Sequence, residues 1–257
     1  MRKLRRSTEA EVIAEFLKNE FYQEEFHADR ESFEQLVLEA DLANEDENAL
    51  RRALLFRRRG HMWREVPSDT QWWEVELEPG DLKFIRVFPR AQWRKIADES
   101  YLLRDIVNRI RTVRFSGSRR DFIARVQAIS YRLRTEHDRS AVLLIGVGEH
   151  EPLTILEGNH RLTAALLAGP AMLSHQFRVL CGFSPHMSRS CWYETNLPNL
   201  WRYGQNRLRN LFYDRDADVS RVLRRISHES EAPTLNGAMN PVRAGKITRA
   251  PSKAGTQ

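Results

Sequence analysis

Residues 141–170 read AVLLIGVGEHEPLTILEGNHRLTAALLAGP, and this stretch decides the fold that we expect for the chain. Residues 142–145 and 153–156 are continuous apolar runs of strand length, and residues 146–152 between them are rich in turn-forming residue types. The pattern therefore predicts two buried strands joined by a turn.

The second strand is followed by a tight turn and a helix. Asn159 is a residue type that commonly caps a helix, and apolar residues then recur at helical spacing at Leu162, Ala165 and Leu166. His160 and Arg161 fall in the first helical turn, where the positive end of the helix dipole disfavours each cation by about 0.3–1 kcal/mol. A phosphate bound by the helix amides beside Gly158 would relieve this cost. The other explanation is an Asn-capped helix whose Arg161 points into water or pairs with a carboxylate.

Residues 157–165, E-G-N-H-R-L-T-A-A, resemble the signature of the ParB/sulfiredoxin-like superfamily, in which a glycine, one variable residue and a basic pair open a helix. The resemblance covers about residues 72–182 and implies a small α+β domain that binds nucleotide phosphates at this turn. Sulfiredoxins carry their catalytic cysteine at the variable position, which is Asn159 here, so sulfinic-acid repair is not implied. ParB partition proteins add a helix-turn-helix domain, which we do not expect because Leu-Pro-Asn at 197–199 interrupts the region after Cys191.

The turn is most similar to that of the free-serine kinases, which have an acidic residue, a glycine, one further residue and His-Arg. This resemblance implies phosphoryl transfer from a nucleotide (ATP, ADP or CTP) to a small hydroxyl compound, with Mg²⁺ as cofactor. It implies nucleotide binding by Gly158, Asn159, His160 and Arg161, catalytic roles for Glu157 and His160, and metal binding by Glu157. Replacing Arg161 by Ala is then expected to weaken nucleotide binding without destabilising the unliganded protein.

The charge of the chain is strongly segregated. The formal net charge is +6, but residues 9–49 hold fourteen acidic and two basic residues, whereas residues 104–134 hold nine arginines and two aspartates. The two segments face each other, or the basic segment faces solvent, or it binds an anionic partner. In the last case the alternative function is a non-enzymatic module that binds nucleic acid or a protein, with a nucleic-acid face at Arg119, Arg120 and Arg125. We favour the nucleotide site over nucleic acid.

The whole chain is predicted to be α+β with three parts. Residues 1–60 form an acidic helical subdomain whose helices begin near Thr8, Ser32 and Asn44. Residues 61–227 form the ParB/sulfiredoxin-like domain, with further strands at 72–77, 82–88 and 177–181 and helices at 91–97, 102–111, 119–133, 201–213 and 219–226. Residues 228–257 form a disordered basic tail, because this segment lacks aromatic residues and is rich in Pro, Gly, Ala, Ser and Lys.

Glu78 and Asp81 are weaker candidates than Glu157 for the carboxylate that binds metal or orients the acceptor. Only the resemblance to the kinases places them in this role.

Composition restricts the class and location of the protein. With 257 residues and 41% hydrophobic content the chain can bury a core, in which we place the tryptophans at 63, 72, 73 and 93. It has no run of about 18 apolar residues and no apolar segment after its basic start, so we expect a cytoplasmic protein with no membrane partner. Cys181 and Cys191 are too few for a disulfide framework and are expected to be reduced thiols.

Overall fold

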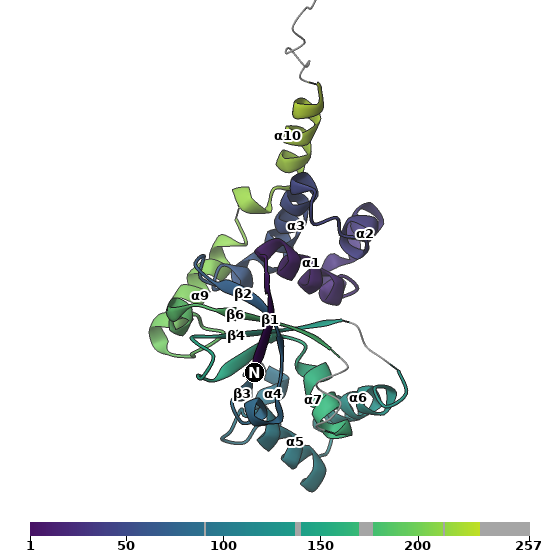
Figure 1. Cartoon of the computed structure of the whole chain (residues 1–257), viewed down its shortest axis with the longest axis vertical. Helices are drawn as coiled ribbons and strands as arrows, with labels where there is room; N and C mark the ends of the chain where they lie inside the picture. Colours follow the sequence, from purple (N-terminus) through teal and green to yellow (C-terminus); the bar gives the residue numbers. More distant parts are fainter. Residues whose placement is uncertain (90, 137–139, 170–176, 213, 232–257) are drawn as a thin grey trace, which may run out of the picture.

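A computed structural model describes residues 1–89, 91–136, 140–169, 177–212 and 214–231, and at its centre lies a six-stranded mixed sheet (Figure 1). The strands lie in the order β1-β2-β6-β4-β5-β3. Their bounds are Arg2–Ser7 for β1, Gln71–Glu76 for β2, Ile85–Val87 for β3, Ala141–Gly146 for β4, Leu153–Glu157 for β5 and Arg178–Phe183 for β6. The chain is therefore α+β, as predicted.

Helices cover both faces of this sheet. One face carries α1 (Glu9–Glu20), α2 (Arg30–Leu38) and α3 (Glu45–Trp63), and the other carries α4 (Ala91–Arg94), α5 (Leu103–Thr112), α6 (Ser118–Arg132) and α7 (Asn159–Ala168) (Figure 1). The carboxyl-terminal part adds α9 (Leu197–Arg209) and α10 (Val219–Glu231). Short 3₁₀ helices lie at η1 (Glu24–Asp29), η2 (Pro79–Lys83), η4 (Pro185–Arg189) and η5 (Arg215–Ala217).

Strand β4 lies between two hydrophobic cores, one on each face of the sheet. It runs parallel to β6 and antiparallel to β5, and all six of its residues are buried. Successive side chains of a strand point to opposite faces of the sheet. Val142 and Leu144 accordingly belong to the core shared with α5, α6 and α7, whereas Leu143 and Ile145 belong to the core shared with α1 and α3. This double burial explains why the strand is a continuous apolar run.

Two of the three predicted amino-terminal helix starts are confirmed. Thr8 Oγ1 accepts a hydrogen bond from the Glu11 amide at 3.2 Å, and Asn44 caps α3 through two amide hydrogen bonds of 3.1 Å. The predicted second helix is present, but it begins at Arg30, directly after η1 and two residues before Ser32, so Ser32 does not cap it. Helix α3 also runs on to Trp63, with a kink at Arg59.

The acidic amino-terminal segment is neutralised by arginines near it. Asp29, which is buried, pairs with Arg57 and Arg58 of α3 at 3.0 and 2.5 Å. Within the residues that the structure describes, no ion pair joins residues 9–49 to residues 104–134. The two charged segments lie on opposite faces of the sheet, in α1 to α3 and in α5 and α6 (Figure 1).

Several elements differ from the predictions. The basic start of the chain forms β1, which pairs with β2 along its length; no strand was predicted there because the segment is polar and only Ser7 is buried. The strand expected at 82–88 is shorter than predicted, because residues 79–83 form η2 and only Ile85–Val87 forms strand β3. Leu-Pro-Asn at 197–199 opens α9, because Asn196 caps the helix and proline is tolerated in a first helical turn.

The other predicted elements are confirmed within a few residues, and the tryptophans at 63, 72 and 93 are buried in the cores. Both cysteines are free and buried. Of the predicted tail, residues 228–231 are the end of α10, and residues 232–257 lie outside the described residues. No described helix is both long enough and apolar enough to cross a membrane.

Candidate functional site

The turn between β5 and α7 has a backbone shape that requires glycine. Gly158 has φ = 99° and ψ = 19°, in the left-handed region that side chains disfavour. A Cβ atom at this position would also lie 3.0 Å from a methyl carbon of Val142. Gly158 is the cap of α7, so the prediction that Asn159 caps the helix was wrong: Asn159 is the first helical residue and is buried.

Arg161 is held within the protein. Its guanidinium lies 3.6 Å from the Glu157 carboxylate, donates to the Ala141 carbonyl at 3.1 Å and donates to the Ser140 hydroxyl. Only 14% of its side chain is exposed. The anion that relieves this cation at the helix start is therefore Glu157 of the same chain.

His160 packs between two aromatic side chains. Its ring centroid lies 5.3 Å from that of Trp93 in α4 and 5.0 Å from that of Phe122 in α6. The first turn of α7 is thus fixed by α4 and α6 on one side and by the start of β4 on the other. His160 and Arg161 consequently point to different surroundings although they are adjacent in sequence.

A cavity of about 260 Å³ lies at the amino end of α7. Of the predicted site residues, it brings together Glu157, Asn159 and His160, while Gly158 forms the turn behind them and Arg161 does not line it. Asn159 is 7% exposed, and its Oδ1 atom has no hydrogen-bond partner among the residues that the structure describes. Leaving a buried acceptor unsatisfied costs about 1–3 kcal/mol, so this atom is suited to a donor group from a ligand.

The opposite wall of the cavity comes from the amino-terminal helices, which sequence reasoning did not place near the turn. It is formed by Asn19, Glu20, Gln23, Glu25 and Arg59, with Gln92 and Trp93 from α4 at the side. Asn19 Nδ2 donates to the Ala141 carbonyl at 2.9 Å, which ties α1 to the same strand end that holds Arg161. The only sequence signal for this wall was the Arg57-Arg58-Arg59 run, and nothing in it distinguished Arg59 from its neighbours.

Arg59 is the cation that lines this cavity. It pairs with Glu20 at 2.7 Å and with Glu25 at 2.9 Å. Burial acts to lower the pKa of Arg59, but hydrogen bonds to Glu25 and Glu20 outweigh it and raise the pKa above its usual value. Glu20 is nearly buried, whereas the Glu25 side chain is half-exposed.

The hydrogen-bond donors and acceptors that line the cavity suit a polar ligand. Carboxylates and Asn159 Oδ1 can accept hydrogen bonds, while Arg59 and the amides at the amino end of α7 can donate them. Among the described residues no three His, Cys, Asp or Glu side chains are grouped to hold a metal ion. Glu157 is the carboxylate of the predicted site that lines the cavity, and it is paired with Arg161 at 3.6 Å. Glu78 and Asp81 are elsewhere, since both pair with the amino group of Met1.

The predicted nucleic-acid face lies on α6. Arg119, Arg120 and Arg125 are exposed, and none of them has an ion pair or side-chain hydrogen bond in the described part of the chain. Arg119 and Arg125 line a second cavity of about 280 Å³ with Lys95 at the amino end of α6. This face carries positive charge that the fold leaves unneutralised.

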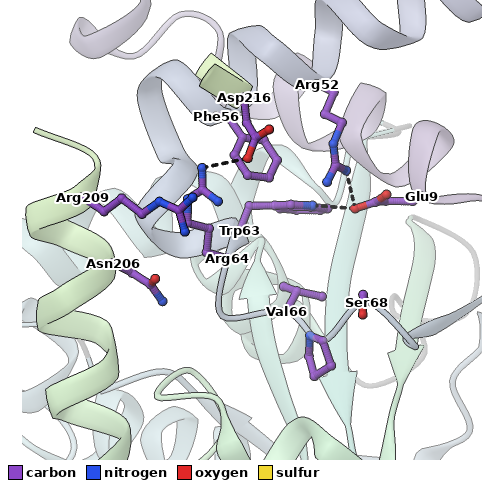
Figure 2. A pocket seen from close by; sticks show the side chains of 11 residues that line it. Glu9, Arg52, Phe56, Trp63, Arg64, Val66, Ser68, Asn206, Arg209 and Asp216 are labelled. Carbon is purple, nitrogen blue, oxygen red and sulfur yellow. Dashed lines mark hydrogen bonds and ion pairs between the residues drawn. The ribbon is translucent and has the colours of Figure 1, made fainter. Parts of the chain in front are cut away.

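A larger cavity, of about 440 Å³, lies between the end of α3, the start of α1 and α9 (Figure 2). Its charged groups are mostly committed to one another: Glu9 accepts from Arg52 at 2.7 Å and from the Trp63 indole at 3.0 Å, and Arg64 pairs with Asp216 at 3.1 Å. Figure 2 shows these pairs across the cavity. These pairs join α1 and η5 to α3, so we interpret the cavity as a junction between structural elements. None of the predicted site residues lines it.

Comparison of the chain with models of known protein families, with curated proteins and with solved structures found no match.

Proposed function

We propose that the chain binds a nucleotide, or another small phosphorylated compound, in the cavity at the amino end of α7. The observation that carries this proposal is the convergence of Glu157, Asn159 and His160 with Arg59 around one cavity. Helix amino ends and arginine are the groups that proteins use most often to hold phosphate oxygens. The resemblance of residues 157–161 to the free-serine kinases favours a nucleotide among the phosphorylated compounds.

The charges of the cavity indicate how the ligand would be held. Arg59 stays in place because the nearly buried Glu20 holds it, and a phosphate would take the position of the half-exposed Glu25. Asn159 Oδ1 would accept from a hydroxyl or amino group of the ligand. A volume of about 260 Å³ is at the small end for ligand sites, so the cavity suits a phosphate with its adjoining sugar, and a nucleobase would extend outside.

The proposed reaction is phosphoryl transfer to a small hydroxyl compound. Such transfer depends mainly on positioning and charge neutralisation, so few side chains are required. Glu157 would orient the acceptor hydroxyl or bind Mg²⁺, and His160, fixed by Trp93 and Phe122, would contact the transferred group. Arg161 would act indirectly, by holding Glu157 in position.

A thermal-shift panel of ATP, ADP, CTP and GTP, each with and without Mg²⁺, tests the binding proposal. A ligand at a hundred times its dissociation constant adds about 2.7 kcal/mol, which raises the melting temperature of a chain of this size by about 5–10 °C. Asn159→Ala should lower ligand affinity about tenfold, the equivalent of about 1.4 kcal/mol. It should leave the unliganded melting temperature unchanged or higher, because the Oδ1 atom that is removed has no hydrogen-bond partner in the described part of the chain.

Asn108→Ala is the matched control, because Asn108 is an exposed asparagine of α5 outside the cavity. It should keep the full nucleotide shift. A parent protein with no shift for any nucleotide would contradict the proposal, and so would equal losses in the two variants. For the reaction, Glu157→Gln should keep nucleotide affinity within a few fold and suppress nucleotide consumption in the presence of hydroxyl acceptors.

A second candidate function is nucleic-acid binding by α6, and it is favoured by the unneutralised Arg119, Arg120 and Arg125. If these three neutralise three phosphates of duplex DNA, log affinity should fall with log salt with a slope of about −2.7. Anisotropy of a labelled duplex would measure it. The triple Ala variant should lose binding while Asn159→Ala keeps it, and no binding at low salt would remove this function.

A further inference from the structure

Helix α9 presents an apolar stripe to solvent. Large apolar side chains recur along it and into the turn that follows, and between 59 and 82% of each is exposed. They are Leu197, Trp201, Leu208 and Leu211, with Phe212 beside them. Single exposed apolar residues are ordinary on a protein surface, but a contiguous stripe marks an interaction site.

The opposite face of α9 packs on the protein through polar side chains and through Tyr203, whose ring contacts His61 and Trp192. Asn199 donates to the Ser188 and Glu194 carbonyls at 2.9 and 2.8 Å, and Asn206 donates to the Glu65 carboxylate at 2.5 Å. Figure 2 shows Asn206 and Arg209 extending from α9 toward the end of α3. The helix is therefore oriented opposite to the usual surface helix, whose apolar face is buried. The hydrogen bonds of Asn199 and Asn206 and the packing of Tyr203 fix this orientation, so the stripe faces away from the core.

The spacing of the stripe is that of a coiled-coil seam. Positions 197, 201, 204 and 208 of α9, and 211 in the turn directly after it, are separated by four, three, four and three residues, which is the heptad spacing of core positions. The central position is Gly204, where an added Cβ atom would meet nothing within 4 Å. A glycine at the centre of a seam allows the backbone of a partner helix to approach closely.

We propose that the α9 stripe is the dimer interface of two copies of this chain, with the two α9 helices packed antiparallel across Gly204. A two-fold axis through this residue sets Leu197 opposite Leu211 of the second copy and Trp201 near Leu208. The stripe is thus complementary to itself, as the interface of a symmetric dimer must be. The large side chains flank the close glycine contact and fill the space on either side of it.

The charges beside the stripe are compatible with this pairing. Arg202 and Arg209 lie one residue after Trp201 and Leu208, outside the seam, and Arg209 extends toward the cavity of Figure 2. Arg207 flanks the seam three residues from the axis, so it faces the region near Trp201 of the second copy and not the other Arg207. Its aliphatic stem can cover Leu200 there.

Light scattering after gel filtration of the full chain tests the proposal. The parent should run at twice the 30.1 kDa of one chain at tens of micromolar and dissociate on dilution. Trp201→Glu and Gly204→Glu should each weaken the dimer at least about 30-fold, the effect of losing an interface hot spot. Gly204→Glu should not perturb the monomer, because the space around its Cβ is open. Both variants should keep the far-ultraviolet circular dichroism of the parent.

Tyr131→Glu is the matched control, because Tyr131 is an equally exposed aromatic residue on α6, at 73% against 72% for Trp201. It should remain dimeric. The proposal is overturned if the parent is monomeric at 100 µM, or if Trp201→Glu and Gly204→Glu dimerise as the parent does. It is also overturned if the parent stays monomeric but binds vesicles of 7:3 phosphatidylcholine and phosphatidylserine through Trp201, since the stripe would then serve a lipid surface.

Discussion

Arg161→Ala is expected to destabilise the unliganded protein. The side chain is 14% exposed, donates to the Ala141 carbonyl and the Ser140 hydroxyl, and lies 3.6 Å from Glu157. Hydrogen bonds from a charged donor contribute about 1.5–3 kcal/mol each, whereas removal of a cation from a helix start regains about 0.3–1 kcal/mol. The net loss should be about 2–6 kcal/mol in the free energy of unfolding.

Urea unfolding followed by tryptophan fluorescence measures this loss. The midpoint should fall by about 1 M with the slope m unchanged. Arg120→Ala is the matched control, since Arg120 is exposed and has no partner in the described residues, and its midpoint should not move. Arg161→Lys should fall between the two, because it keeps the charge beside Glu157 but loses the forked donor. Equal midpoints for Arg161→Ala and Arg120→Ala would refute the reasoning and restore the sequence-based expectation of an exposed phosphate ligand.

The remaining predictions concern the turn, the pH dependence and the thiols. Gly158→Ala should lower the free energy of unfolding by about 1–3 kcal/mol, because of the positive φ of Gly158 and the contact of the added Cβ with Val142. The control is Gly80→Ala, whose added Cβ meets nothing within 4 Å and should leave stability unchanged. Thermal melts compare the two variants. Burial acts to raise the pKa of Glu11, but hydrogen bonds from Arg5, Ser7 and Arg178 prevail and lower it from 4.5 to about 2. A carboxylate whose pKa is lower in the folded than in the unfolded state adds stability at pH values above its unfolded pKa, and this stability is lost as pH falls toward the folded pKa. The free energy of unfolding should therefore drop between about pH 4.5 and 2. The drop should be smaller in Glu11→Gln, which has no carboxylate at this position. Burial raises the pKa of the Cys181 and Cys191 thiols, so both should react with a thiol reagent only after denaturant is added.

The sequence predicted the centre of the fold well. Residues 142–145 are apolar on both faces because β4 is covered on both sides, and Thr8 and Asn44 cap helices because their side chains satisfy backbone amides locally. Local chemistry determines such features, so local patterns reveal them. Strand β1 was missed because its polar side chains face solvent and its pairing with β2 is made by the backbone.

The candidate site was predicted only in part. Glu157, Asn159 and His160 were found because the turn and helix start that hold them are contiguous in sequence. The partner of Arg161 was left open, since only the folded geometry shows that Glu157 reaches it. Arg59 and Glu20 were missed because packing of α1 and α3 on the sheet brings them to the turn from about a hundred residues away in sequence.

The most direct test of the proposed site is a titration of the ¹³C-histidine-labelled chain with ADP and Mg²⁺, followed by the ring resonances of its eight histidines. His160 can be assigned by its loss in His160→Asn, and its position between Trp93 and Phe122 should separate its signal by ring-current shifts. We predict that the His160 resonance moves in a saturable manner while that of His228, on the exposed α10, stays in place. Saturation of the protein with ADP and Mg²⁺ without movement of His160, or no change in any histidine at millimolar nucleotide, would contradict it.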